Sequence, residues 1–216
     1  MIGFSDRAIR SHAVQRLEPM EDDVLLAYLL QLVQVLKYET YLECDLAKFL
    51  LRRALKSQRV GHFFFWYLKS EIHMPEAAVR FGLLLEAYCR GCGSHMPDLQ
   101  AQVEVLKQVE EVADQLKDKG IKDKAEYART VLGKAKVTGF QLPLEPSIRL
   151  NKVEVKKVFD SAQKPLWLRF DNEDPVGSPY NVMFKVRDER RTSGVGVVVD
   201  SAAWVGLAPL NVFGYV

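Results

Sequence analysis

Apolar residues recur three and four positions apart over residues 21–117, which is the spacing of one face of an α-helix. The pattern predicts helices over 21–37, 42–59, 60–73, 76–90 and 95–117. The helix over 21–37 is apolar on nearly every side and too short to cross a bilayer, so we expect it to be buried among the others.

Proline and glycine separate these helices. Pro75 prevents the helix over 60–73 from continuing, and Gly91 and Gly93 are stop signals after the next helix. A series of antiparallel helices with buried centres is typical of an armadillo-like or HEAT-like superhelix of helical repeats. A plain helical bundle fits the same order, and the sequence has no strict repeat.

After residue 136 the pattern changes to the alternation typical of strands. A connection marked by Gly139, Pro143 and Pro146 leads into alternating apolar positions over 148–158. Further strands are expected over 165–170 and 181–185, with a turn at 171–175 between them. The predicted fold is therefore mainly α, with a few antiparallel β-strands following the helices.

Composition excludes several classes of protein. The chain has 216 residues, 48% of them hydrophobic and 27% charged, and 30 basic residues nearly balance 28 acidic ones. That balance disfavours nucleic-acid binding, which needs a concentrated basic surface. We expect a cytoplasmic protein with reduced cysteines, because no transmembrane segment or signal peptide is recognisable and the three cysteines make no disulfide framework.

Cys89, Cys92 and His95 have the spacing of half a zinc site. His62 or His73 would have to complete it, because the chain has no second cysteine pair. Packing and capping at a helix end account for the same residues, so no metal site is expected.

Two other features admit both a structural and a functional interpretation. The aromatic run over 63–67 would point to all sides of a helix, which favours core packing over a ligand box. Ser161 lies in a loop between two predicted strands and Lys185 ends a third, so a hydroxyl, loop amides and an ammonium group could hold phosphate oxygens. Any β protein with surface lysines offers these residue types, so their spacing alone supports phosphate binding only weakly.

Longer stretches of sequence are more specific. Residues 31–39 (QLVQVLKYE), 59–71 (RVGHFFFWYLKSE) and 80–91 (RFGLLLEAYCRG) closely resemble the helical domain of class I phosphatidylinositol 3-kinase catalytic subunits. Residues 164–168 (KPLWL) and 182–185 (VMFK) resemble the first strands of that family's kinase N-lobe. The resemblance covers about residues 8–185. It implies the C-terminal portion of a helical (PIK accessory) domain over 1–137 and the start of an N-lobe over 138–186.

The resemblance also implies a function. Family members transfer the γ-phosphate of ATP to the 3-hydroxyl of inositol lipids, with magnesium. By position, Ser161 would lie near the ATP phosphates, Lys185 would contact them, and Phe159 and Trp167 would line the hydrophobic surroundings of the nucleotide. A regulatory or adaptor subunit and a phosphoinositide membrane are the implied partners, with recruitment of the full-length family members from the cytoplasm to the plasma membrane.

The chain departs from the family after Lys185. Residues 186–193 differ from the family pattern, and its catalytic Asp-Arg-His and metal-binding Asp-Phe-Gly segments have no counterpart. We therefore expect no catalytic residue in this chain, no productive binding of ATP and magnesium, and no kinase activity of the chain alone. The alternative function is a non-catalytic helical-repeat scaffold that binds a kinase regulatory subunit.

The remaining tail, residues 187–216, resembles nothing in the family. After Arg191 its only charged residue is Asp200, and its glycines predict disorder, with an edge strand over 195–199 as the other possibility. A splice variant or intron read-through at Lys185 would account for the change. The sequence does not decide the isoform, because residues 71–75 and 89–93 point to different members of the class.

Overall fold

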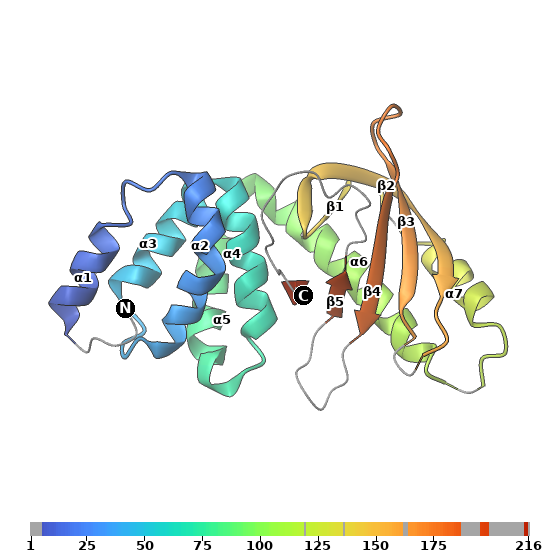
Figure 1. The fold of residues 1–216 in the computed structure, drawn as a ribbon, viewed down its shortest axis with the longest axis horizontal. Coiled ribbons are helices and arrows are strands. Elements are labelled where there is room, and N and C mark those ends of the chain that lie inside the picture. Colours follow the sequence, from blue (N-terminus) through green and yellow to red (C-terminus); the bar gives the residue numbers. More distant parts are fainter. Residues whose placement is uncertain are drawn as a thin grey trace. The chain divides into compact units, whose positions relative to one another are not determined.

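A computed structural model describes residues 6–118, 120–135, 137–161, 164–186, 195–198 and 214–215. Within these residues the chain forms helices followed by an antiparallel sheet, which confirms the predicted mainly α class and its order (Figure 1). The chain divides into two compact units, Met1–Met96 and Pro97–Val216. Each unit is described by itself.

The first unit is all helical. Its elements are α1 (Arg7–Gln15), α2 (Asp22–Val35), η1 (Leu36–Tyr38), α3 (Asp45–Lys56), α4 (Gln58–Glu71), α5 (Pro75–Gly91) and η2 (Gly93–His95). Helix α4 contacts α2, α3 and α5, and is the centre of the unit. The aromatic run explains this position, because Phe64, Phe65 and Trp66 are buried on successive sides of α4. The prediction that the run over 63–67 forms core is confirmed.

The predicted burial of the helix over 21–37 is wrong. In α2 the apolar side chains of Val24 and Tyr28 are 46% and 55% exposed, and Leu25, Leu29, Leu32 and Val33 are the buried ones. Helix α2 therefore buries one face only. A helix that is apolar all round needs neighbours on all sides, and in this unit α4 has them.

A buried arginine fixes the connection after α2. Arg80 of α5 is 8% exposed, and its guanidinium donates to the carbonyl oxygens of Glu39 at 2.6 Å and Tyr41 at 2.8 Å. It also donates to the carbonyl oxygen of Leu36. The neighbouring helix thus supplies a donor to the carbonyl groups of Glu39 and Tyr41, and a second donor to that of Leu36, which also accepts the Glu39 amide at 3.2 Å.

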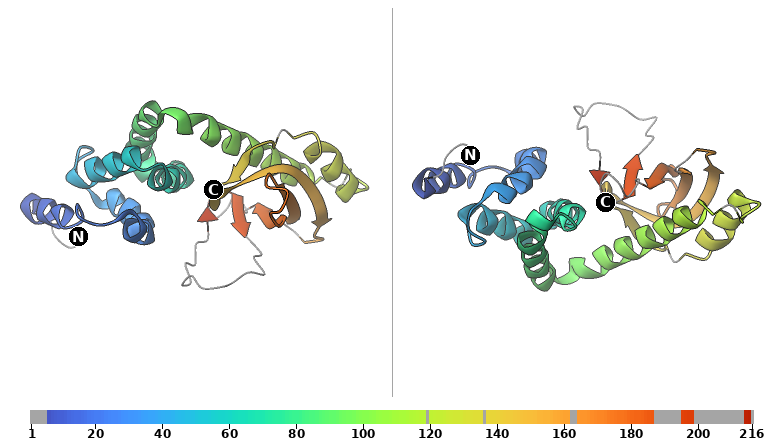
Figure 2. Two further views of the ribbon diagram at one scale, coloured as in Figure 1. Left: turned by 90° about the horizontal axis from the view of Figure 1, so that it is seen from above. Right: turned by 90° about the horizontal axis from the view of Figure 1, so that it is seen from below.

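The second unit places helices on one side of a curled sheet. Helices α6 (Met96–Gln115) and α7 (Lys124–Leu132) lie along the same side of it (Figure 2). The strands are β1 (Phe140–Leu142), β2 (Glu145–Val158), β3 (Leu166–Asn172), β4 (Tyr180–Val186), β5 (Val195–Val198) and β6 (Gly214–Tyr215). Each strand pairs with the next in antiparallel fashion, in the order β1-β2-β3-β4-β5-β6.

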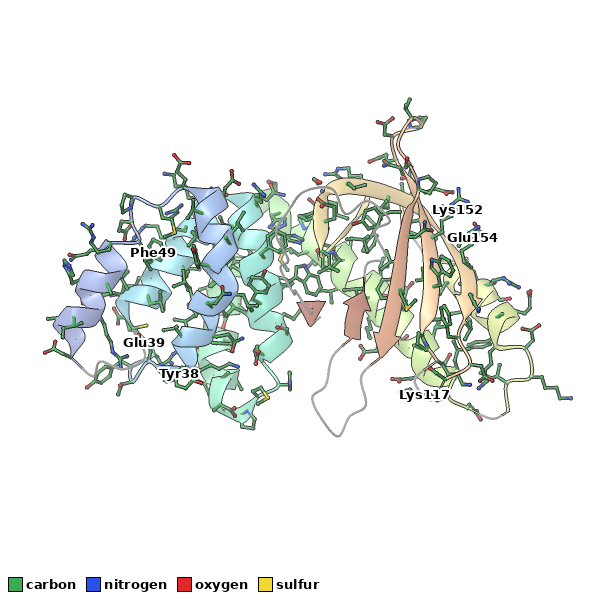
Figure 3. The ribbon with its side chains drawn as sticks, viewed as in Figure 1. Tyr38, Glu39, Phe49, Lys117, Lys152 and Glu154 are labelled. Carbon is green, nitrogen blue, oxygen red and sulfur yellow. The ribbon has the colours of Figure 1, made fainter. Side chains whose placement is uncertain are left out.

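Strand β2 shows how the sheet is built. Val153 and Val155 are buried, whereas Lys152 and Glu154 alternate with them on the exposed face (Figure 3). The core also contains Phe140, Leu166, Leu168, Phe170, Val182 and Phe184 from the other strands. This period of two is the alternation from which the strand was predicted.

The strands predicted over 148–158, 165–170 and 181–185 are confirmed, while α1, α7, β1 and β6 were not foreseen. Helix α7 falls in the stretch with the least distinctive sequence, and β1 occupies part of the predicted connection. In the predicted tail, Val195–Val198 forms a strand that pairs with β4, but it is not the expected edge strand, because Gly214–Tyr215 pairs with its other side. The rest of 187–216 lies outside the described residues. None of the described helices is long and apolar enough to cross a bilayer.

Candidate functional site

The candidate nucleotide site is the loop that joins β2 to β3. The two strands run antiparallel up to the pair of Val158 and Leu166. Beyond it, the Phe159 amide donates to the Pro165 carbonyl oxygen at 2.9 Å, and the Lys164 amide donates to the Ser161 carbonyl oxygen at 3.1 Å. Residues 162 and 163 lie outside the described residues. The described ends of the loop are therefore held together by backbone hydrogen bonds.

Phe159 and Trp167 come together at this end of the hairpin. Their rings stack, with centroids 6.5 Å apart and planes 18° from parallel. The ammonium group of Lys157 lies 4.8 Å from the centroid of the Phe159 ring, a cation–π contact. The indole Nε1 of Trp167 is buried and has no hydrogen-bond partner among the described residues. The predicted pair of aromatic residues thus forms one continuous aromatic surface.

Ser161 and Lys164 are the polar groups of the loop. Ser161 is exposed, so a ligand can reach its hydroxyl. The Lys164 ammonium pairs with the Asp160 carboxylate, and this hydrogen bond lowers the pKa of Asp160. Lys164 has a φ of +44°, in the left-handed region that disfavours a residue with a side chain. Sequence reasoning did not nominate Lys164, although its place at the mouth of a predicted strand-connecting loop marks it as a candidate cation.

Lys185 reaches the same end of the sheet through the register of β4. Phe184 pairs with Leu166, so the next residue along β4 lies beside the end of the loop. On its other side the backbone of Lys185 pairs with Gly196. The side chain of Lys185 lies outside the described residues. The four predicted site residues therefore share one end of the sheet at the level of the backbone.

Cys89 at the end of α5 and Cys92 directly after it have structural partners. Cys92 Sγ donates to the Cys89 carbonyl oxygen at 3.5 Å, and His95 Nδ1 is hydrogen-bonded to the hydroxyl of Tyr88 at 2.8 Å. Burial raises the pKa of both thiols, which disfavours the thiolate form that binds metals. Among the residues that the structure describes, no three His, Cys, Asp or Glu side chains are grouped to hold an ion.

Comparison with known proteins finds similarity to the phosphoinositide 3-kinase family. Residues 2–101 match the accessory domain (PIK domain) of the phosphoinositide 3-kinase family. Over 193 residues the chain is 43% identical to phosphatidylinositol 3-kinase 2 of Dictyostelium discoideum, and over 190 residues it is 40% identical to phosphatidylinositol 3-kinase 1 of that organism. Each alignment covers 87% of this chain and so extends well into the second unit.

The helical unit is thus an accessory domain of the kind found in lipid kinases. The chain is similar to phosphatidylinositol 3-kinases over 87% of its length. It spans 10% and 12% of the lengths of the two Dictyostelium relatives.

Proposed function

We propose that this chain is part of a lipid kinase that transfers the γ-phosphate of ATP to the 3-hydroxyl of phosphoinositide lipids. The observation that carries the proposal is the alignment with two phosphatidylinositol 3-kinases over 87% of the chain, across both units. The class I assignment is supported by the helical-domain and N-lobe motifs together.

Each part of the chain has a role in this proposal. Residues 1–137 are the helical accessory domain, with its helices as the repeats of an armadillo-like superhelix that serves as scaffold. Residues 138–186 are the start of the kinase N-lobe, and 187–216 lie outside the family. The adaptor subunit and the phosphoinositide membrane are the partners, and recruitment from the cytoplasm to the plasma membrane brings the kinase to its lipid substrate.

The β2–β3 loop would hold the nucleotide. The stacked rings of Phe159 and Trp167 offer an apolar surface beside it, and the exposed hydroxyl of Ser161 can donate to a phosphate oxygen. Lys185 would neutralise phosphate charge from the neighbouring strand. Bound ATP supplies the phosphoryl group and magnesium screens its charge. We assign no magnesium ligand and no catalytic residue to this chain.

Nucleotide binding is tested by thermal denaturation of the 216-residue chain with a non-hydrolysable ATP analogue and magnesium. A ligand that binds only the folded state raises the melting temperature. We expect a small rise that Phe159→Ala and Lys185→Ala abolish. Lys152→Ala is the matched control, because Lys152 is exposed further along β2, away from the loop. An equal rise in all variants would show that the loop does not hold the nucleotide.

Catalysis is tested separately. We expect the purified 216-residue chain to transfer no phosphate from ATP to phosphatidylinositol, because the segments that orient magnesium and the nucleophile have no counterpart in the sequence. Lipid phosphorylation that Lys185→Ala abolishes would overturn this expectation.

The second candidate function is a non-catalytic scaffold for a kinase regulatory subunit. The exposed apolar side chains of Val79 and Leu83, one turn apart on α5, favour it. Co-purification of a regulatory subunit, lost in a Val79→Ser and Leu83→Ser double variant and accompanied by no thermal response to nucleotide, would support the scaffold over the kinase.

A further inference from the structure

Two of the three cysteines lie together at the end of α5. Cys89 is in the last turn of the helix and Cys92 is its C-cap, and both are free and half-buried. The backbone at Cys92 is still in the right-handed helical region, with φ −77° and ψ −4°. Residues three apart on a helix project from the same face. The two thiols are therefore neighbours.

The turn that carries the two thiols suits a disulfide bond. Cα atoms three residues apart in a helix are about 5 Å from each other, within the range of about 4.4–6.8 Å that disulfides span. Cβ atoms at this spacing are about 5–6 Å apart and a disulfide holds them at about 3.5–4.5 Å, so the turn must tighten slightly. Gly91 and Gly93 flank Cys92, and a Cβ at Gly93 would meet nothing within 4 Å. The backbone beside Cys92 therefore has both the freedom and the space for this change.

The surroundings of the two sulfurs favour a disulfide over a pair of thiolates. Burial raises the pKa of Cys89 and of Cys92, and the neighbouring Cys92 raises that of Cys89 further. Strongly oxidising dithiols owe their potential to a reduced form that is stabilised as the thiolate. Cys89 and Cys92 lack this stabilisation, so their disulfide is not easily reduced. Because the thiolate is the attacking species, formation of the bond accelerates as the pH rises.

We propose that Cys89 and Cys92 form a reversible disulfide by exchange with a small disulfide such as oxidised glutathione. The Cys92 thiolate attacks one sulfur of the small disulfide, forms a mixed disulfide and releases the first small thiolate. The Cys89 thiolate then attacks Cys92 Sγ, forms the intramolecular bond and releases the second. Both protein thiols give up their protons to the two released thiolates. One small disulfide is thus reduced to two thiols while the protein dithiol is oxidised.

The disulfide clamps the turn that leads from α5 into η2. The Cys92 amide donates to the Tyr88 carbonyl oxygen at 2.8 Å, and the His95 amide donates to the Cys92 carbonyl oxygen at 3.1 Å. Tyr88 and His95 are buried and joined by their side chains at 2.8 Å. Cys92 is therefore the backbone link between two hydrogen-bonded residues of the core. Oxidation restrains this link, so the helical unit should be more stable with the disulfide than without it.

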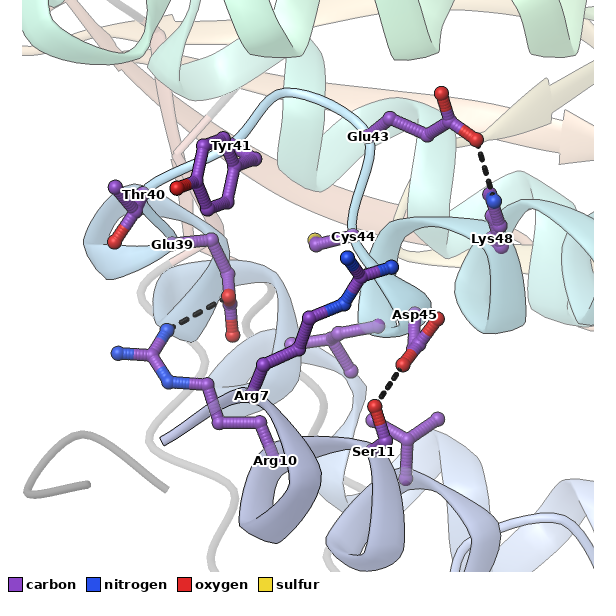
Figure 4. A pocket seen from close by; sticks show the side chains of 12 residues that line it. Arg7, Arg10, Ser11, Glu39, Thr40, Tyr41, Glu43, Cys44, Asp45 and Lys48 are labelled. Carbon is purple, nitrogen blue, oxygen red and sulfur yellow. Dashed lines mark hydrogen bonds and ion pairs between the residues drawn. The ribbon is translucent and has the colours of Figure 1, made fainter. Parts of the chain in front are cut away.

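The third cysteine provides an internal control. Cys44 precedes α3 and lines a cavity of about 360 Å³ together with Arg7, Glu39 and Asp45 (Figure 4). It is half-buried like the other two cysteines, and burial raises its pKa as well. No other cysteine is near it in the sequence. Cys44 thus shares the burial and the raised pKa of the pair but has no adjacent thiol, and should form no disulfide within the chain.

The disulfide is tested by equilibrating the 216-residue chain with mixtures of reduced and oxidised glutathione at mildly alkaline pH. The remaining thiols are then alkylated with iodoacetamide, and peptides are identified by mass spectrometry. We expect a peptide in which Cys89 and Cys92 together lack two hydrogen atoms and carry no alkyl group, while Cys44 is alkylated or bound to glutathione. Dithiothreitol should restore two thiols that can be alkylated.

Single variants separate the pair from general oxidation. Cys44→Ser should keep the disulfide, whereas Cys89→Ser and Cys92→Ser should each leave one thiol that binds a single glutathione. Oxidation should raise the melting temperature of the parent chain and of Cys44→Ser, because both form the clamp. It should not raise the melting temperature of Cys89→Ser or of Cys92→Ser.

Three results would overturn the proposal. The first is alkylation of both Cys89 and Cys92, or a separate glutathione on each, at every ratio of reduced to oxidised glutathione. The second is a disulfide that links two chains in place of the bond within one. The third is a bond that forms but leaves the melting temperature unchanged, which would contradict the clamp. None of these measurements involves a nucleotide, so their outcome is independent of the proposed kinase function.

Discussion

Tyr88 closes over Gly61 so tightly that no side chain fits at the glycine. A Cβ atom at Gly61 would collide with the Tyr88 hydroxyl and would lie 2.6 Å from the Ala54 carbonyl oxygen. The hydroxyl cannot move aside without loss, because it is hydrogen-bonded to the buried His95 at 2.8 Å. Helices α3, α4 and α5 therefore pack closely around Gly61, where only glycine fits.

Gly61→Ala should destabilise the helical unit by about 2 kcal/mol, since overpacking forces a rearrangement of backbone or of a hydrogen-bonded side chain. Gly82→Ala is the matched control on α5, where the nearest atom to a new Cβ is Ile72 Cδ1 at 3.7 Å. It should stabilise by about 0.5–1 kcal/mol through helix propensity. Urea denaturation followed by circular dichroism measures both. Equal effects of the two substitutions would contradict the close approach.

Arg80→Met should destabilise by about 2–4 kcal/mol, because it leaves the carbonyl oxygens of Leu36, Glu39 and Tyr41 without their buried donor. Arg90→Met, at the exposed end of the same helix, removes only an ion pair with Glu86 and should cost about 0.5 kcal/mol or less. Denaturation midpoints compare the two. A loss at Arg80 no greater than that at Arg90 would show that the connection over 39–45 holds its shape without the arginine.

The stability of the helical unit should depend on pH through Glu71. Burial alone would raise the pKa of Glu71, but hydrogen bonds from Lys37 at 2.7 Å and Gln34 at 2.8 Å outweigh it and the pKa is lowered. A carboxyl whose pKa falls on folding contributes stability above its unfolded pKa, about 4.5, and loses it as the pH falls through the folded value.

Glu71→Gln should therefore destabilise the protein at pH 7, and the difference from the parent chain should shrink as the pH falls below about 4.5. Denaturation curves recorded between neutral and acidic pH measure this difference. Glu86→Gln, in an exposed pair with Arg90, should change stability little at any pH. A Glu71 difference that is constant with pH would mean that packing, not charge, is lost.

The backbone at Lys164 offers a test within the candidate site. Lys164→Gly and Lys164→Ala both remove the ion pair with Asp160, so their difference isolates the left-handed φ of +44°. The glycine variant should be the more stable by about 1 kcal/mol, the reverse of the order expected in ordinary backbone conformations. Thermal denaturation decides the order, and greater stability of the alanine variant would contradict the strained backbone.

Periodicity predicted most helices and the main strands, because burial of one face repeats with the period of the element. It misjudged α2, since Val24 and Tyr28 are apolar yet exposed, and only the positions of neighbouring helices determine which apolar face is buried. Helix α7 has just two buried residues, Ala128 and Leu132, too few to define a period. Strand β1 is three residues long and depends on its pairing with β2.

For the candidate site, the sequence predicted the residues but not the contacts between them. Phe159, Ser161, Trp167 and Lys185 were nominated from sequence resemblance. The stacking of Phe159 on Trp167 follows from the pairing of Val158 with Leu166, which two irregularities of register in β2 determine. The sequence did not predict the cavity that Arg7, Glu39 and Asp45 line. Its lining comes from α1, the connection after η1 and the beginning of α3, and no local sequence pattern predicts that these segments lie side by side.

Leu150 pairs with Phe140 on β1 and with Asn172 on β3, so at this residue β2 is paired on both edges. A strand held on both edges at one residue cannot peel away from either neighbour without disturbing the other. The sheet should therefore open cooperatively, with the amide of Leu150 among the last to exchange with solvent. The loop at the far end of β2 is consequently carried between two strands that are paired on both edges, because β3 also pairs with β2 and β4 from Leu166 to Phe170.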